Sequence, residues 1–98
     1  MNIVFYSSRL QDASTCIGEA TRLFGAVIGK KYIQRILLLR ATDEFRHLFG
    51  HRALKLHPLK GNRDGQYSVT LTGNYRLILE KIDEETVRIV EVEDYHGN

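Results

Sequence analysis

The stretch that decides the fold is residues 65–94, "GQYSVTLTGNYRLILEKIDEETVRIVEVED". In residues 65–72, apolar side chains alternate with serine and threonine, which is the period of a strand with one buried face. Residues 74–82 alternate in the same way, and the Gly-Asn pair between the two runs tolerates the positive φ of a tight hairpin turn. Residues 87–94 are apolar on both faces, which is typical of a central strand. The stretch therefore predicts antiparallel strands joined by short turns.

The residues before this stretch predict a strand and then a long helix. The sequence "NIVFYS" at 2–7 is rich in β-branched and aromatic residues, which favour a strand, and Ser7 or Ser8 can cap the helix that follows. Apolar residues then recur at intervals of three and four over about 9–28, which predicts one helix that ends at Gly29.

The middle of the chain completes the predicted fold. Residues 30–41 predict a second helix, and residues 42–50 predict a short helical turn capped by Thr42 or Asp43. Pro58 suits the edge of a sheet because proline has no N–H to donate. The order of elements predicts an α+β fold, in which the N-terminal strand and two helices pack on one face of a twisted, mainly antiparallel sheet. The other face is left for function.

Length and composition narrow the class of protein. A chain of 98 residues is expected to form one domain, residues 1–98. No apolar run approaches the roughly 20 residues that cross a bilayer, and the N-terminus does not resemble a secretory signal. The single cysteine, Cys16, cannot form an internal disulfide, and a buried or idle thiol accounts for it more simply than a nucleophile does. We therefore expect a cytoplasmic protein with no membrane partner.

Charge is unevenly distributed along the chain, although the net charge is only +2. Residues 1–50 carry a net +3, residues 51–81 a net +4, and residues 82–98 a net −5. A basic region of this kind is consistent with contacts to phosphate or nucleic acid, although a solvated basic face gives the same pattern.

Residues with chemically useful side chains are expected at one end of the sheet, some on its uncovered face and some at the chain's end. They are His57, Lys60, Arg63, Arg76, Asp94, Tyr95 and His96. Cleavage of RNA by its own 2′-hydroxyl needs a base, an acid for the leaving 5′-oxygen, and cations that stabilise charge on the phosphate. An aromatic ring on which a base can stack helps to splay the strand. The set is suited to this chemistry.

The same residues also have simpler structural explanations. His57 is also typical of a hydrogen-bonded histidine at a strand edge, and the loop cations are also typical of solvated charges. Arg76 needs only a carboxylate partner, such as Glu80 or Glu91. These alternatives stay open on the residues alone.

The sequence predicts no metal site and no cofactor. His47 and His51 are four residues apart, as in zinc-binding helices, but Leu48 stands where those helices carry a glutamate. A glycine also interrupts the helix between the two histidines.

Residues 56–79, "LHPLKGNRDGQYSVTLTGNYRLIL", followed by a strand that ends in "VEDYH", resemble the HigB-type killer toxins of the RelE/ParE superfamily. The resemblance extends from about Tyr32 to His96. It implies a RelE-like fold over a single toxin domain, and a ribosome-dependent mRNA endonuclease of a type II toxin–antitoxin pair. Such toxins cut translated mRNA in the ribosomal A site without a metal.

The resemblance also implies roles for the residues that match the family's motifs. His57, Asp94 and His96 are candidates for transferring protons or for orienting the group that does so. Lys60 and Arg76 are candidates for stabilising the phosphate. Tyr95 is a candidate for stacking on a base, and Arg63 is a further candidate for RNA binding.

The chain departs from the family at one position. Many members carry another arginine in the strand where this chain has Val69, Thr70 and Leu71, and Arg63 is a candidate substitute.

The resemblance also implies the partners. They are a cognate HigA-like antitoxin, the ribosome and mRNA, with operator DNA bound only through the antitoxin complex. Two alternatives remain: a non-enzymatic gyrase inhibitor of the ParE type, and a degenerate toxin that acts as a co-repressor with its antitoxin.

Overall fold

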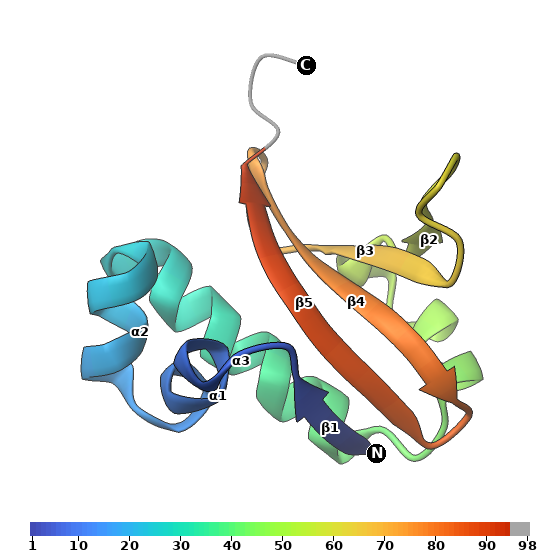
Figure 1. Cartoon of the computed structure of the whole chain (residues 1–98), viewed down its shortest axis with the longest axis horizontal. Helices are drawn as coiled ribbons and strands as arrows, with labels where there is room; N and C mark the ends of the chain where they lie inside the picture. Colours follow the sequence, from blue (N-terminus) through green and yellow to red (C-terminus); the bar gives the residue numbers. More distant parts are fainter. Residues whose placement is uncertain (95–98) are drawn as a thin grey trace.

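A five-stranded sheet in the order β1-β5-β4-β3-β2 organises the protein (Figure 1). The computed structural model describes residues 1–94. The strands are β1 (Asn2–Phe5), β2 (His57–Pro58), β3 (Gln66–Thr70), β4 (Tyr75–Asp83) and β5 (Thr86–Asp94). The pairings β2–β3, β3–β4 and β4–β5 are antiparallel, and β1 pairs with β5 in parallel. The predicted α+β fold with a mainly antiparallel sheet is confirmed.

Within residues 1–94, five helical segments join these strands. They are α1 (Ser8–Thr15), α2 (Ile17–Phe24), α3 (Ala26–Ala41) and the 3-10 helices η1 (Phe45–Gly50) and η2 (Arg52–Leu54). The three α-helices gather on one side of the molecule, away from β2 (Figure 1), and Arg35 of α3 reaches the end of β3, where its Nε donates to the backbone oxygen of Thr70 at 2.8 Å. Within the described residues, no helix has the length and apolar character that crossing a bilayer requires.

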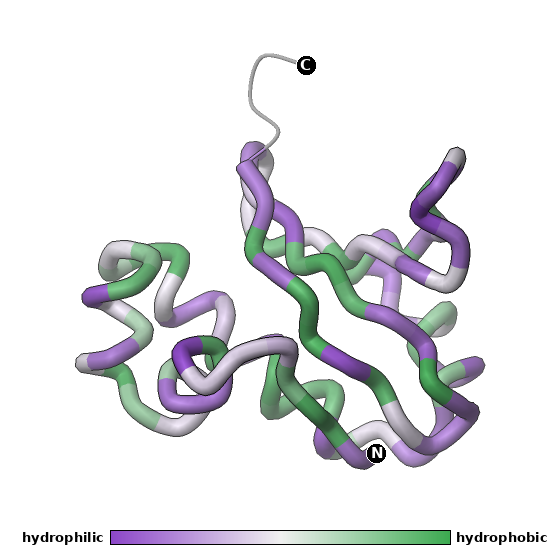
Figure 2. The backbone as a smooth tube through the Cα atoms, in the orientation of Figure 1, coloured by the Kyte–Doolittle hydropathy of each residue, from purple (hydrophilic) through white to green (hydrophobic). Residues whose placement is uncertain are grey.

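The core lies between these helices and one face of the sheet. Figure 2 shows apolar and polar residues alternating along β4 and β5, as expected for a sheet with one buried face. The strands contribute Val69, Leu77, Leu79, Val87 and Ile89, and all of them are fully buried. Tyr32 of α3 also lies in this core, and its hydroxyl donates a hydrogen bond of 2.6 Å to the backbone oxygen of Leu10.

The helical region differs from the prediction of one long helix that ends at Gly29. Cys16 is extended, with φ −138° and ψ 111°, and it separates α1 from α2. Gly25 has φ 85° and separates α2 from α3, which then continues through Gly29. The sequence around Cys16 is rich in weak helix formers, and positive φ at Gly25 ends a helix, so the apolar period alone overestimated its length.

Gly29 does not stop a helix because it serves a different purpose. A Cβ at this position would lie 2.8 Å from the backbone carbon and oxygen of Ala20. The glycine therefore allows α3 to pass directly against the backbone of α2.

Two further predictions, about the cap at Thr42 and about the turn between β3 and β4, were also wrong. Thr42 ends α3 rather than capping the next turn, and its hydroxyl donates to the backbone oxygen of Leu38 at 2.8 Å. The β3–β4 connection does not use positive φ at Gly73 or Asn74. Instead, the Thr72 hydroxyl accepts hydrogen bonds from the backbone N–H groups of Asn74 and Tyr75, at 3.3 and 3.2 Å, which is how hydroxyl side chains stabilise turns.

Other predictions, on Pro58, on the cap at Ser7 and on the position of the last strand, agree with the structure. Pro58 lies in the edge strand β2, as expected. Ser7 caps α1, since its hydroxyl accepts a hydrogen bond of 3.3 Å from the backbone N–H of Leu10. The strand predicted to be central, β5, is an interior strand paired with β1 and β4, while β4 occupies the middle of the order.

Candidate functional site

The face of the sheet opposite the core carries His57 and Arg76, and the side chain of the loop residue Arg63 reaches it. In the β3–β4–β5 register, Arg76 lies opposite Thr70 on one side and Glu93 on the other. His57 lies opposite Ser68, which lies opposite Ile78. Because residues two apart on a strand share a face, Arg76 and Ile78 lie on the same side of β4. The prediction that Arg76 projects from the face opposite the helices agrees with this register.

Arg76 contacts Glu93, a residue that the sequence reasoning did not select. The Nε and Nη2 atoms of Arg76 each lie 2.5 Å from Oε2 of Glu93. The predicted alternatives, Glu80 and Glu91, lie elsewhere in the register: Glu80 forms an ion pair with Arg88, and Glu91 lies opposite Ile78.

Glu93 also holds Arg63. The Nη1 atom of Arg63 lies 3.3 Å from Oε1 of Glu93, and its Nε lies 3.3 Å from Oε1 of Gln66. One carboxylate therefore contacts a guanidinium group through each of its oxygens. The side chains of Arg63, Arg76 and Glu93 are 30%, 20% and 24% exposed, so the cluster is partly shielded but reachable from solvent.

The loop that carries Arg63 has a defined backbone. Gly61 and Gly65 adopt φ of 77° and 82°, conformations that other residues rarely adopt. The N–H of Leu59 donates to the oxygen of Gln66 at 2.9 Å, and the N–H of Gln66 donates to the oxygen of Arg63 at 3.0 Å. These bonds close the loop and direct Arg63 back towards the sheet.

His57 is held at the sheet edge by two contacts. Its Nδ1 lies 3.0 Å from the backbone oxygen of Lys55, which can only accept a hydrogen bond. We assign the proton of the neutral ring to Nδ1 on this basis. The hydroxyl of Ser68 lies 3.2 Å from Nε2 and 3.4 Å from Nδ1, and with the proton on Nδ1 it donates to Nε2. Ser68 is buried, so it fixes the ring while the ring itself stays exposed.

Lys60 and Asp94 are both exposed. Lys60 lies in the loop between β2 and β3. Asp94 ends β5 opposite Tyr75, so alternation along the strand places it on the other face of the sheet from Glu93 and Arg76. Tyr95 and His96 lie outside the described residues. The structure thus brings Arg63 and Arg76 together, and by register places His57 two strands away on the same face, about 12 Å from Arg76.

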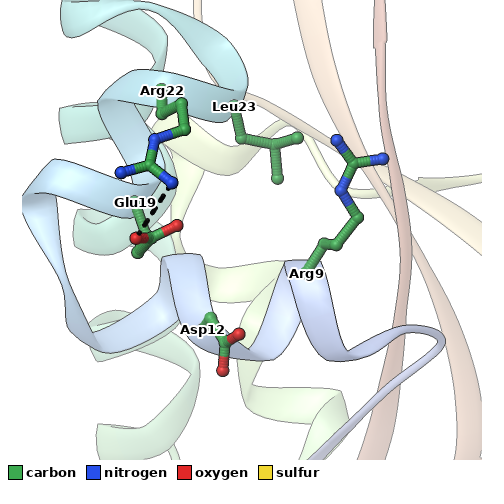
Figure 3. A pocket seen from close by; sticks show the side chains of 5 residues that line it. All are labelled: Arg9, Asp12, Glu19, Arg22 and Leu23. Atoms are coloured by element: carbon green, nitrogen blue, oxygen red, sulfur yellow. Dashed lines mark ion pairs between the residues drawn. The ribbon is translucent and has the colours of Figure 1, made fainter.

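Two hollows among residues 1–94 lie away from these side chains. One hollow of about 160 Å³ lies between α1 and α2, and it is lined by Arg9, Asp12, Glu19, Arg22 and Leu23. Figure 3 shows Arg22 and Glu19 as an ion pair across from Arg9 and Asp12. None of these is a predicted site residue. The exposed His57 and the partly exposed side chains of Arg63 and Arg76 make the candidate site a surface reachable from solvent.

A separate ionic cluster at the β4–β5 turn has a structural role. Glu84 accepts hydrogen bonds from Lys81 at 2.9 Å and from the backbone N–H of Arg46 at 2.7 Å, which ties η1 to the turn. The hydrogen bond that Lys81 donates to Glu84 raises the pKa of Lys81, and the bonds that Glu84 accepts from Lys81 and from the Arg46 backbone lower the pKa of Glu84.

No candidate metal centre is present in the part of the chain that the structure describes. Across residues 1–94, histidine, cysteine and acidic side chains do not gather in groups of three that could hold an ion. Cys16 is exposed, so the buried alternative for this thiol was wrong.

Comparison with known proteins gives one partial sequence relative. No protein-family model matches the chain. A segment of 42 residues is 45% identical to Endoribonuclease HigB of Proteus vulgaris, and it covers 43% of this chain and 45% of that protein. The match thus spans less than half of the relative's length. It confirms the resemblance to HigB-type toxins that the motifs indicated.

Solved structures share the fold over nearly the whole chain. YafQ from E. coli matches with a TM-score of 0.61 at 17% identity, over 95% of this chain and 91% of that chain. A YoeB/ParE toxin from Agrobacterium tumefaciens matches with a TM-score of 0.59 at 18% identity, over 98% and 100% of the two chains. A YoeB–YefM complex from Staphylococcus aureus matches with a TM-score of 0.56 at 23% identity, over 98% and 97%. At these identities the likeness establishes a RelE-like fold.

Proposed function

We propose that residues 1–98 form a single toxin domain of a type II toxin–antitoxin pair, and that it is a metal-independent endoribonuclease. It would act in the bacterial cytoplasm and cut translated mRNA in the ribosomal A site. The observation that carries the proposal is the convergence of Arg63 and Arg76 on the sheet face that also presents His57. The similarity to Endoribonuclease HigB supports the choice of RNA as substrate.

The proposed reaction uses the 2′-hydroxyl of the message as nucleophile. A base removes its proton, the 2′-oxygen attacks phosphorus, and the bond from phosphorus to the 5′-oxygen breaks. An acid gives a proton to the departing 5′-oxygen, so the products are a cyclic phosphate and a 5′-hydroxyl. The guanidinium groups stabilise the negative charge that builds on the phosphate oxygens.

The side chains divide these roles by position. His57 is a candidate base, and in that role its Nε2 would exchange the hydroxyl of Ser68 for the 2′-hydroxyl of the message. His96 and Asp94 are candidates for the acid or for orienting it, Lys60 for a further phosphate contact, and Tyr95 for stacking on a base. The open face accommodates an extended strand, and the ribosome would supply the remaining contacts that hold the message.

The expected partner is a HigA-like antitoxin. The YoeB–YefM complex among the structural relatives supports a protein partner of this kind. Operator DNA would be bound only through the toxin–antitoxin complex.

Mapping of mRNA 5′ ends tests the proposal. The chain is induced alone, as Arg76→Ala, as His96→Ala, and as Arg88→Ala for control. Arg88 is an arginine on the neighbouring strand β5 that pairs with Glu80 outside the proposed site. We expect cuts within translated codons for the unaltered chain and the control, and loss of about 100-fold in cutting for the other two.

Two outcomes contradict the proposed nuclease activity. Growth arrest without mRNA cuts would support the gyrase inhibitor. Absence of both growth arrest and mRNA cuts would support the co-repressor that has lost its nuclease activity.

A further inference from the structure

We infer that Glu93 is a positioning residue of the proposed nuclease site: it holds Arg63 beside Arg76, so that two guanidinium groups act on one phosphate. The inference rests on the proposed function. It assigns a role to a residue to which the family resemblance gives none, and it explains how a loop arginine enters a site built on strands.

The geometry of the carboxylate carries the inference. Arg76 contacts Oε2 of Glu93 through two nitrogens, and Arg63 contacts Oε1 through one. Two guanidinium groups repel each other, and a carboxylate between them offsets this repulsion. Glu93 is itself fixed, because it lies within β5 directly opposite Arg76. It is therefore a rigid point to which the loop arginine is attached.

Arg63 needs such an attachment because of where it lies. It comes from the loop between β2 and β3, and a long loop side chain loses considerable rotamer freedom when it is held in one place. Gln66, the first residue of β3, makes the second contact through Nε. Glu93 and Gln66 together fix both the direction and the reach of the guanidinium group.

Strand β3, which faces Arg76, contains no cation. Thr70 lies opposite Arg76, and the Nε of Arg35 in α3 donates to the backbone oxygen of Thr70 at 2.8 Å. Arg63 differs from Arg35 because it shares a carboxylate with Arg76 and so adds a second positive charge to the same cluster. With Glu93 included, the cluster keeps a net charge of +1, which still attracts a phosphate.

Two other roles for Glu93 make different predictions. If Glu93 only ties β5 to β4 and the loop, its removal lowers thermal stability and leaves the rate unchanged. If Glu93 occupies the place of the phosphate and competes with it, its removal tightens RNA binding and raises the rate. A positioning role predicts a lower kcat that depends on the presence of Arg63.

A double-mutant cycle separates these roles. We compare Glu93→Gln, Arg63→Ala and the double variant with the unaltered protein, measuring kcat and KM for cleavage of a defined message on programmed ribosomes. The control is Glu80→Gln, which makes the same charge change in the neighbouring cross-strand pair with Arg88. Thermal unfolding of each variant reports on stability separately.

The expected result is a shared loss. Glu93→Gln and Arg63→Ala each lower kcat by about 10- to 100-fold with a smaller change in KM, and the double variant loses no more than Arg63→Ala alone. Glu80→Gln stays within about twofold of the unaltered protein. Losses that multiply in the double variant, a gain of rate in Glu93→Gln, or an equal loss in Glu80→Gln overturns the inference.

A second measurement does not depend on nuclease activity. The Nε–H signals of the arginine side chains are followed by NMR during titration with inorganic phosphate. We expect phosphate to shift Arg63 and Arg76 together in the unaltered protein, and Arg76 alone in Glu93→Gln. If the unaltered protein cuts no message, the proposed function fails, and this titration then decides whether Glu93 positions Arg63. Independent responses of the two arginines in the unaltered protein contradict the positioning.

Discussion

At the residue scale, Ser68 is the side chain that links the sheet to the proposed base. It is 2% exposed, and its hydroxyl contacts the ring of His57 from the adjacent strand. The sequence motif contains this serine, but nothing in the motif shows that it touches the histidine. The contact follows from register, because β2 pairs with β3 so that the two residues lie opposite each other.

We predict that Ser68→Ala lowers kcat for mRNA cleavage by about 10-fold, since the imidazole loses the partner that orients it. Stability should fall by no more than about 1 kcal/mol, the usual contribution of one hydrogen bond. Ser14→Ala is the matched control, because Ser14 is also buried but bonds only within α1. If both variants cleave at the same rate, Ser68 does not orient His57.

Tyr32 gives a prediction about stability and pH. Burial raises the pKa of this phenol well above its usual value of about 10. Above pH 10 the unfolded chain releases this proton whereas the folded chain keeps it, so the folded state binds more protons and loses stability as pH rises. Tyr32→Phe should lower the free energy of unfolding by about 1 kcal/mol at neutral pH, because the hydrogen bond to Leu10 is lost. The free energy of unfolding of this variant should fall less steeply at alkaline pH than that of the unaltered protein.

Urea unfolding at about pH 8 and pH 11 checks this prediction. Tyr6 is the matched control because its side chain is 73% exposed. Tyr6→Phe should follow the unaltered protein at both pH values. An alkaline decline of equal size in the Tyr32→Phe protein would show that other groups cause it.

At the element scale, the packing of α2 against α3 depends on one glycine. A methyl group at Gly29 would meet backbone atoms of Ala20 at 2.8 Å and the nitrogen of Thr21 at 3.0 Å, and backbone atoms cannot move aside as flexible side chains can. We predict that Gly29→Ala lowers the free energy of unfolding by about 1–2 kcal/mol. Overpacking costs about 1–3 kcal/mol, and the better helix propensity of alanine returns up to about 1 kcal/mol.

Gly18→Ala provides the comparison for this prediction. Gly18 lies in α2, and an added methyl group would meet only the sulfur of Cys16 at 3.8 Å, an ordinary contact. Its stability in urea should be unchanged or higher by up to about 1 kcal/mol. A Gly29→Ala protein as stable as the Gly18→Ala protein would mean that α3 can move away from α2 without cost.

The elements differ in how well the sequence predicts them. The strands follow from alternation because each strand buries one face on a shared core, and Pro58 marks the edge for a local chemical reason. The helices were harder because their apolar period continues across Cys16 and Gly25, where the backbone turns. Periodicity reports which residues face the core and does not report where a helix bends between them.

The ion pair of Arg76 and Glu93 was predictable in principle. The two-residue connection between Asp83 and Thr86 places residues at equal distances from the turn opposite each other, and this count reaches Arg76 on one strand and Glu93 on the other. The pairing shifts by one residue between Lys81 and Asp83 and shifts back between Ile78 and Leu79. The two shifts cancel, so the simple count is correct again at Arg76. The contact with Arg63 could not be counted in this way, because a loop conformation sets it.

At the scale of the whole molecule, the core formed by the described residues ends before Tyr95 and His96, the last predicted site residues. All core residues, and the partly buried residues packed on them, fall within residues 1–92 of the described chain. β5 is paired on both sides in the sheet and needs no further residues to hold its register up to Asp94. Stability and cleavage should therefore respond differently to loss of residues 95–98.

We predict that deletion of residues 95–98 abolishes mRNA cleavage and leaves the melting temperature within about 3 °C of the full chain, since a change of 1 kcal/mol shifts it by about 4–8 °C in a domain of this size. Full-length His96→Gln should lose activity to a similar degree if the imidazole is the group that matters. Thermal unfolding and 5′-end mapping are measured on the same preparations. A truncated protein that melts much earlier would make the last four residues part of the fold, and one that still cuts mRNA would remove Tyr95 and His96 from the proposed site.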